Sequence, residues 1–213
     1  MGEELVTNLQ RFLFEAIEAH DEDRVAHLLE RGASAQRAGP NGYPIHAATD
    51  ELGEGGPVPV VLRLLEHGAS AAQRDDAGNT ALTLGAILER WDVVALFLEA
   101  GVNPHVRNID NVSGLTLAAA AGNTSMVREM LARGQCRGEL DRWVGFSGRS
   151  MLGHAANRLD FPLIRMLIEA GAGLDVADDA YRIPLENLPP RASSNPETWD
   201  RAARLLTVRS KEP

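Results

Sequence analysis

Apolar and polar positions recur along the chain with a helical spacing, and the pattern itself repeats. Five apolar segments each end in glycine: LLERG at Gly32, LLEHG at Gly68, FLEAG at Gly101, MLARG at Gly134 and LIEAG at Gly171. Successive glycines are 36, 33, 33 and 37 residues apart, so the basic period is 33 residues. A period of about 20–50 residues is typical of stacked-repeat proteins, in which each repeat contacts only its neighbours. We therefore expect function to lie on an exposed surface rather than in a buried pocket.

The segment 78–101 illustrates the elements that the pattern predicts. Small residues such as Gly85 give a first short helix a close-packing face, and the apolar run 93–98 forms one face of a second helix. Gly101 follows, at a helix C-terminus that favours a left-handed residue. The polar run 103–111 predicts a turn that leads to the next unit. Each unit is therefore helix, turn, helix and extended loop.

These residues resemble the ankyrin-repeat family, whose unit follows the pattern Gly-x-Thr-Pro-Leu-His-Leu-Ala-Ala. Four stretches of the chain match it, at residues 43–48, 78–86, 111–119 and 148–156. The second of them departs from the pattern, with Ala81 in place of proline and Thr83 in place of histidine. The resemblance implies an all-α fold, namely an ankyrin-repeat α-solenoid of stacked helix-turn-helix units with projecting β-hairpin-like loops. A tetratricopeptide array has a similar period but needs longer helices and bulky aromatic residues, and only 5% of this chain is aromatic.

The resemblance covers nearly the whole chain, so residues 1–213 are predicted to form a single ankyrin-repeat domain. Its units lie at about residues 9–36, 37–72, 73–105, 106–139, 140–175 and 176–208. The first and last are degenerate, as expected of end units that cover the open ends of a stack. Two insertions lengthen the period. Glycines and glutamates at 51–56 predict a mobile, solvated loop, and the second insertion falls within 135–147.

The charge balance restricts the choice of partner. The chain has 21 basic and 30 acidic residues, a net charge of −9. This charge disfavours nucleic acid as a partner and permits a basic protein partner. Lys211 is the only lysine, and such a preference for arginine favours a bacterial source with a GC-rich genome.

Several features bear on location. Residues 1–19 lack the basic start and apolar core of a secretory signal. No apolar run reaches the ~20 residues that span a bilayer. The single cysteine, Cys136, excludes an internal disulfide framework and a cysteine-based zinc site. We therefore expect a cytoplasmic monomer with no membrane partner.

The sequence lacks the motifs of catalysis. It has no HExxH, no GxxxxGK[ST] and no GxSxG. His46 matches the family histidine, which implies that it hydrogen-bonds backbone between loops, and His154 is expected to be an interior imidazole. Asp21 is expected to cap the second helix of the first unit. Cys136 lies beside two arginines but has no nearby base. We therefore predict a protein that is not an enzyme and needs no metal or cofactor.

The resemblance also implies binding through a concave side made of loop tips and the exposed sides of the first helices. The residues at those positions are Asp50, Glu51, Asp76, Asn79, Ile87, Leu88, Ile109, Asp110, Val112, Trp143, Phe146, Arg149, Asn157 and Arg158. The set has an apolar centre and a charged rim, the layout of a protein interface. Two interpretations stay open for Trp143 and Phe146, which either anchor a partner or fold back over their own units.

The leading hypothesis is a non-catalytic protein-protein interaction module that binds one protein partner. In a bacterium, this would include an immunity or inhibitor protein whose acidic face occludes a basic toxin. One alternative is a host-directed secreted effector adaptor. The other is an enzyme or ligand-binding protein with its site in the 135–147 insertion.

Overall fold

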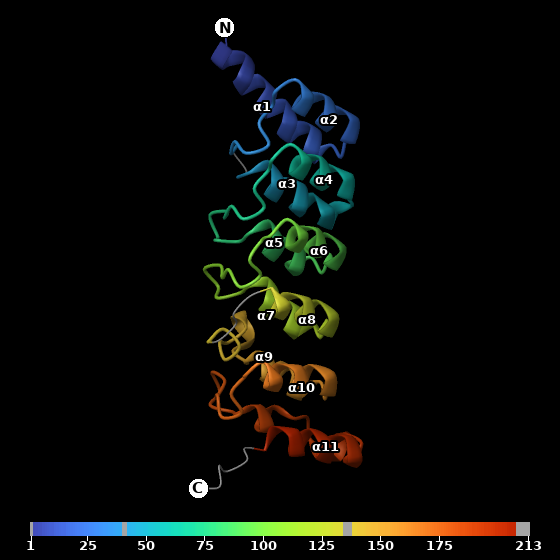
Figure 1. The fold of residues 1–213 in the computed structure, drawn as a ribbon, viewed down its shortest axis with the longest axis vertical. Coiled ribbons are helices and arrows are strands. Elements are labelled where there is room, and N and C mark those ends of the chain that lie inside the picture. The colour runs from blue at the N-terminus through green and yellow to red at the C-terminus, as the bar shows by residue number, and fades with distance from the viewer. Residues whose placement is uncertain (1, 40–41, 134–137, 208–213) are drawn as a thin grey trace. The chain divides into compact units, whose positions relative to one another are not determined.

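The computed structural model describes residues 2–39, 42–133 and 138–207, apart from the side chains of residues 2–6 and 146. The chain forms two compact units, Met1–Ile109 (unit 1) and Asp110–Pro213 (unit 2). Each unit is a row of antiparallel helix pairs joined by long loops (Figure 1).

Unit 1 contains three helix pairs. They are α1 (Gly2–Glu18) with α2 (Glu22–Glu30), α3 (Pro44–Asp50) with α4 (Val58–Glu66), and α5 (Ala81–Ile87) with α6 (Trp91–Glu99). A short 3-10 helix, η1 (Glu51–Glu54), follows α3. Helix α3 packs against α1 and α5, and α4 packs against α2, so each pair lies on the next. In this unit the long loops project on the side of the first helices, away from α2, α4 and α6 (Figure 1).

Unit 2 continues the same pattern with two complete pairs and a modified last repeat. The pairs are α7 (Gly114–Ala121) with α8 (Thr124–Ala132), and α9 (Met151–Asn157) with α10 (Phe161–Glu169). The last repeat comprises the 3-10 helices η3 (Pro184–Asn187) and η4 (Arg191–Ser193) and the helix α11 (Pro196–Leu206). Another 3-10 helix, η2 (Gly145–Ser147), precedes α9. Helix α9 packs against α7 and η3, and α10 packs against α8 and α11.

Polar side chains fix where the helices begin. In seven of the described helices the residue before the first turn accepts a hydrogen bond from the backbone N–H three residues later, which satisfies an otherwise unpaired donor. These residues are Asp21, Thr80, Ser113, Asn123, Ser150, Asp160 and Asn195. The cap by Asp21 confirms the prediction made for the acidic run after α1.

The repeated glycines end the second helices as predicted. Gly101 has φ +82°, and no atom lies within 4 Å of the position that a Cβ would take. The left-handed backbone, rather than a lack of space, therefore favours glycine here. The equivalent Gly32, Gly68 and Gly171 also have positive φ, and Gly134 lies outside the described residues.

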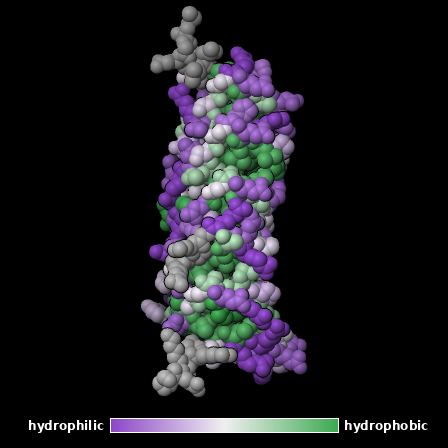
Figure 2. Space-filling view, in the orientation of Figure 1, coloured by the Kyte–Doolittle hydropathy of each residue, from purple (hydrophilic) through white to green (hydrophobic). Residues whose placement is uncertain are grey.

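The core of each unit lies between its helix layers. In α5, residues 81–86 are all buried, whereas in α6 only one face is buried, and it includes the fully enclosed Phe97. A Cβ on Gly85 would lie 3.3 Å from Val94, so the absence of a side chain lets α6 approach α5 closely. The outer faces are mixed, and Figure 2 shows apolar residues exposed between polar ones over unit 1.

The first insertion differs from its prediction. Residues 51–54 form η1 rather than an irregular solvated loop, and Leu52 is buried. The backbone N–H of Gly56 donates to the Glu51 carbonyl at 2.7 Å and closes the turn. The prediction counted glycines and glutamates, and it overlooked that Leu52 gives the segment an apolar side chain to bury.

Candidate partner-binding surface

Hydrogen bonds between successive loops organise the projecting side of unit 1. The Arg74 guanidinium donates to the Arg107 carbonyl at 2.6 Å, and the Ile109 N–H donates to the Ala77 carbonyl at 2.9 Å. His46 Nε2 lies 3.1 Å from the Gln73 carbonyl, which confirms the expected bridging role. The loop tips are therefore held by side chains and backbone that do not depend on a partner.

His46 is held in its neutral form. Burial lowers its pKa, and this effect outweighs the hydrogen bond to Gln73 and the negative charge of Asp75, both of which favour the charged form. A neutral imidazole donates through one nitrogen only, so the bond to Gln73 assigns the proton to Nε2. His46 therefore has a structural role rather than a role in proton transfer.

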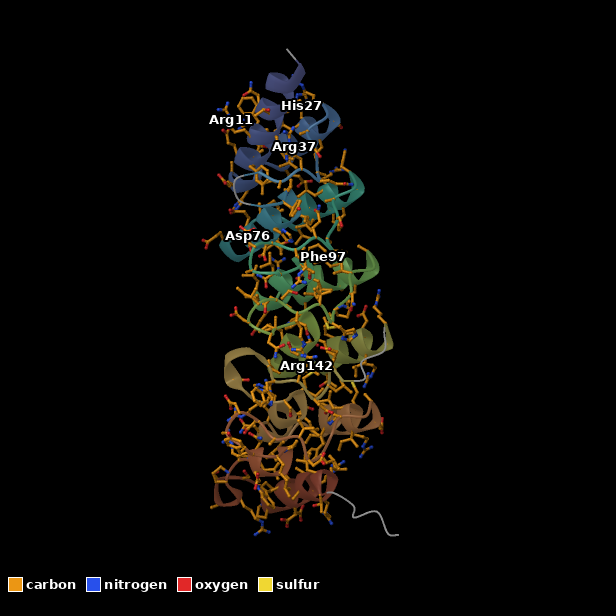
Figure 3. All side chains as sticks on the ribbon, turned by 90° about the vertical axis from the view of Figure 1, so that its left-hand side faces the viewer. Arg11, His27, Arg37, Asp76, Phe97 and Arg142 are labelled. Carbon is orange, nitrogen blue, oxygen red and sulfur yellow. The ribbon has the colours of Figure 1, made fainter. Side chains whose placement is uncertain are left out.

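Four of the predicted contact residues in unit 1 are exposed: Asp50, Asp76, Ile87 and Ile109. The side chains of Ile87 and Ile109 are 49% and 74% exposed, which is unusual for isoleucine. Asp76 projects outward from its loop, on the side that faces the viewer in Figure 3. The apolar residues therefore lie open to solvent beside acidic ones.

The remaining predicted residues of unit 1 are more enclosed. Leu88 is partly buried, and a Cβ on Gly53 would lie 3.1 Å from it, so Leu88 packs against η1. Glu51 accepts a hydrogen bond from His20 Nε2 at 2.8 Å. We define the unit 1 patch as Asp50, Glu51, Asp76, Ile87, Leu88 and Ile109.

The prediction that Asn79 contacts a partner is corrected by the structure, because its side chain is buried and forms hydrogen bonds within the fold. Its backbone N–H and side-chain amide donate to the two carboxylate oxygens of Asp75, at 2.7 and 2.9 Å. Its side-chain oxygen accepts from Asn108 at 2.8 Å. Both ends of the amide are thereby used inside the fold, so Asn79 is not available to a partner.

Asp50 is the electrostatically perturbed member of the unit 1 patch. Its pKa is raised from 3.8 to about 6, first by partial burial and then by the negative charges of Asp75 and Glu51. A positive group from a partner would relieve this repulsion and favour the ionised carboxylate.

Replacing Asp50 by asparagine is expected to stabilise the folded chain at about pH 8 and not at about pH 4. Because the folded pKa lies above the ordinary value, the stabilising contribution of Asp50 is fully present below pH 3.8 and is lost as the pH rises through about 6. The gain should stay below about 1 kcal/mol, since solvent screens an exposed carboxylate. Thermal unfolding of both proteins at the two pH values measures it, with Asp76→Asn as the matched control. An equal gain at both pH values would contradict the expectation.

In unit 2, Trp143 combines the two interpretations that the sequence left open. Its indole N–H donates to the Ala177 carbonyl at 3.0 Å, so the ring folds back onto the next loop. The residue is nevertheless 45% exposed. Trp143 is therefore both a link between loops and a fixed aromatic surface. The side chain of Phe146 and all of Cys136 lie outside the described residues.

Two of the predicted polar residues of unit 2 hydrogen-bond to neighbouring helices, Arg149 to η3 and Arg158 to α7. Arg149 Nε donates to the Asn187 side chain at 3.0 Å, and Arg158 Nη1 donates to the Ala120 carbonyl at 2.9 Å. Asp110 is exposed, and Asn157 is partly exposed. We define the unit 2 patch as Asp110, Trp143, Arg149, Asn157 and Arg158.

The prediction that Val112 lies on the exposed surface is also corrected by the structure. It is 9% exposed, and a Cβ on Gly145 would lie 2.7 Å from its Cγ2 atom. The side chain therefore packs against the backbone of η2, because the loop curls over the valine rather than leaving it at the surface.

His154 is the other histidine for which the sequence predicted an interior imidazole. Its Nε2 lies 2.8 Å from the Ser147 hydroxyl, and the side chain is partly buried. Burial lowers its pKa, and the positive charges of Arg149 and Arg158 lower it further. No carboxylate completes a catalytic group with this serine and histidine among the described hydrogen bonds.

One surface residue escaped the sequence analysis altogether. Tyr181 is 90% exposed and has φ +60°. Two similar runs of sequence, DDAGN at 75–79 and DDAYR at 178–182, could have identified it. Tyr181 stands at the position that corresponds to Gly78, which has a left-handed backbone. Because tyrosine takes the place of glycine at this turn, the glycine pattern did not point to this position.

The described part of the chain offers neither a metal centre nor a transmembrane helix. No group of three or more His, Cys, Asp or Glu residues in it could hold a metal ion. None of the helices it contains has the length and apolar character needed to cross a membrane.

The helix pairs, left-handed glycines, bridging histidine and hairpin-like loops define the ankyrin-repeat fold, as the sequence predicted. No family model matches the chain. A segment of 76 residues, 35% of the chain, is 38% identical to the E3 ubiquitin-protein ligase KEG of Arabidopsis thaliana, and it spans only 5% of that protein.

Two solved structures are similar to this chain over nearly its whole length. One is a chain from the solved complex of the predatory endopeptidase Bd0816 from Bdellovibrio bacteriovorus with the immunity protein Bd3460. It is 22% identical, with a TM-score of 0.67 and 92% of this chain and 96% of that chain covered. The other is the ankyrin repeat protein EF0377, which is 17% identical, with a TM-score of 0.69 and the same two coverages. At these identities the similarity establishes the fold.

Proposed function

We propose that this chain is a non-catalytic protein-protein interaction module that binds one protein partner through its projecting loops and first helices. The observation that carries the proposal is the unit 1 patch, in which Ile87 and Ile109 stay exposed beside Asp50 and Asp76. Exposed apolar residues rimmed by charge are typical of protein interfaces. The acidic rim favours a partner with a basic surface.

We further propose that the chain is an immunity or inhibitor protein. The similarity to a chain from a complex between an endopeptidase and an immunity protein supports this hypothesis. An inhibitor needs a rigid surface rather than catalytic groups, and the loop-to-loop hydrogen bonds supply that rigidity. The captured partner is then expected to be an enzyme that loses activity when the chain is added in equimolar amount.

Capture of the partner from a lysate of the source cells, with identification by mass spectrometry, tests the proposal first. With the purified partner, Asp76→Arg and Asp110→Arg should each slow association about three- to tenfold at low salt, because reversed charge removes electrostatic steering. Leu88→Ala and Trp143→Ala should instead speed dissociation about tenfold or more, because they remove buried contacts. Surface plasmon resonance measures both rates.

Glu99→Arg, at the exposed end of α6, is the matched control. It makes the same change of charge away from the loops and should leave both rates close to those of the original chain. Unchanged affinity in all four test variants would place the interface on another surface. Failure to capture any protein would contradict the proposed function itself.

A further inference from the structure

Two loop tips, one in each unit, have the same hydrogen-bonded turn. In the first, Asp75 N–H donates to the Asn79 carbonyl at 2.9 Å, and Gly78 N–H donates to the Asp75 carbonyl at 2.9 Å. In the second, the corresponding bonds run from Asp178 to Arg182 and from Tyr181 to Asp178, at 2.9 and 3.0 Å. The residue at the fourth position is left-handed in both, with φ +79° at Gly78 and +60° at Tyr181.

Tyrosine is costly at this position. A left-handed backbone brings Cβ close to the following carbonyl, which glycine avoids, and bulky residues with positive φ are rare. The side chain recovers little within the fold, since Tyr181 is 90% exposed and contributes almost nothing to the core. Positive φ also occurs at His20, Glu89, Asn111 and Leu159, but of these five residues Tyr181 is the one that exposes a large hydrophobic side chain. Strain combined with a fully presented ring indicates a role in function.

The loop beneath Tyr181 is firmly held. The buried Asp178 carboxylate accepts hydrogen bonds from the N–H groups of Ala180 and Arg182, at 2.9 and 2.8 Å, and from the Arg182 guanidinium at 3.1 Å. The Asp179 N–H donates to the Gly148 carbonyl at 3.1 Å, and the indole of Trp143 donates to Ala177, just before the turn. The aromatic ring is therefore presented by a backbone that loses little conformational freedom on binding.

We propose that Tyr181 is the aromatic anchor of this module, and that it inserts into an apolar pocket on the surface of the protein partner. A ring on a narrow tip is open on nearly every side, so a flat surface would cover only part of it and a pocket is needed to bury it. Tyrosine is among the residues that dominate binding energy when buried in a partner, because it offers a large rigid surface with a polar end. The inference rests on the proposed function.

The test is to replace Tyr181 with glycine, which removes the ring and relieves the strained backbone together. The substitution should therefore raise the stability of the folded chain while it lowers the affinity for the partner. Tm should rise by about 2–4 °C, and the affinity for the partner captured by the original chain, then purified, should fall at least about thirtyfold. Tyr181→Phe keeps the ring and should retain most of the affinity. Leu62→Ala is the control, since it removes an exposed apolar side chain from α4.

The outcomes separate the inference from the proposed function. A more stable Tyr181→Gly protein that binds as tightly as the original chain overturns the anchor and leaves the proposed function standing. A Tyr181→Gly protein with a lower Tm overturns the anchor as well, because the tyrosine would then be structural. Failure of the original chain to capture any protein overturns both.

Discussion

Replacing Phe97 by alanine is expected to lower the free energy of unfolding by about 3–5 kcal/mol. Phe97 is fully enclosed, and its ring lies on the backbone of α5, where a Cβ on Gly85 would be 3.8 Å away. Since Gly85 has no side chain to fill the space, the surroundings cannot close the cavity that the missing ring leaves. The loss of stability therefore combines the free energy of transferring the ring from water into the core with the cost of the unfilled cavity.

Urea denaturation, monitored by far-UV circular dichroism, measures the change in the free energy of unfolding. Leu62→Ala is the control, because this leucine of α4 is 39% exposed and its truncation should cost less than about 1 kcal/mol. Equal losses for the two variants would show that α6 is not packed on α5 as described.

Replacing Asp178 by alanine should lower the free energy of unfolding by about 2–4 kcal/mol, because it leaves two backbone N–H groups and a guanidinium without their acceptor. Burial alone would raise the pKa of Asp178, but hydrogen bonds from Arg182 and Asn187 and the charge of Arg182 lower it overall. Its stabilising contribution is therefore present above about pH 4 and is lost as the pH falls through the lowered folded pKa.

The difference between Asp178→Ala and the original chain should accordingly be largest near neutral pH and shrink in acid. The neighbouring Asp179 provides the control, because its side chain is exposed and Asp179→Ala keeps the backbone bond to Gly148. Urea titrations of the three proteins at neutral and acid pH measure this. A loss for Asp178→Ala that does not change with pH would rule out the ionised carboxylate as its source.

The sequence predicted the repeating features of the fold well, because they depend on local chemistry. Gly101 needs only a left-handed backbone, Asp21 needs only a free N–H at a helix start, and the role of His46 follows from its place in the repeat. These requirements are local to a few neighbouring residues, so the sequence pattern reports them directly.

The sequence could not predict which way a loop side chain turns. Asn79 and Val112 occupy loop positions that the resemblance assigns to the surface, but Asp75 draws the first inward and η2 covers the second. Leu52 likewise becomes buried through contacts that no local pattern encodes. Tyr181 was missed for a different reason, since the repeat pattern was defined by glycines and a tyrosine stands here in the place of Gly78.

The bonds between neighbouring loops have a consequence for protein engineering. Several of them end on main-chain oxygens rather than on side chains, including those of Gly68, Arg107, Trp143 and Ala177. Since every amino acid carries such an oxygen, these bonds place no demand on the identity of the accepting residue. Randomised libraries at outward-facing tip positions such as Asp76 and Ala180 should thus retain the scaffold and alter only the specificity of recognition.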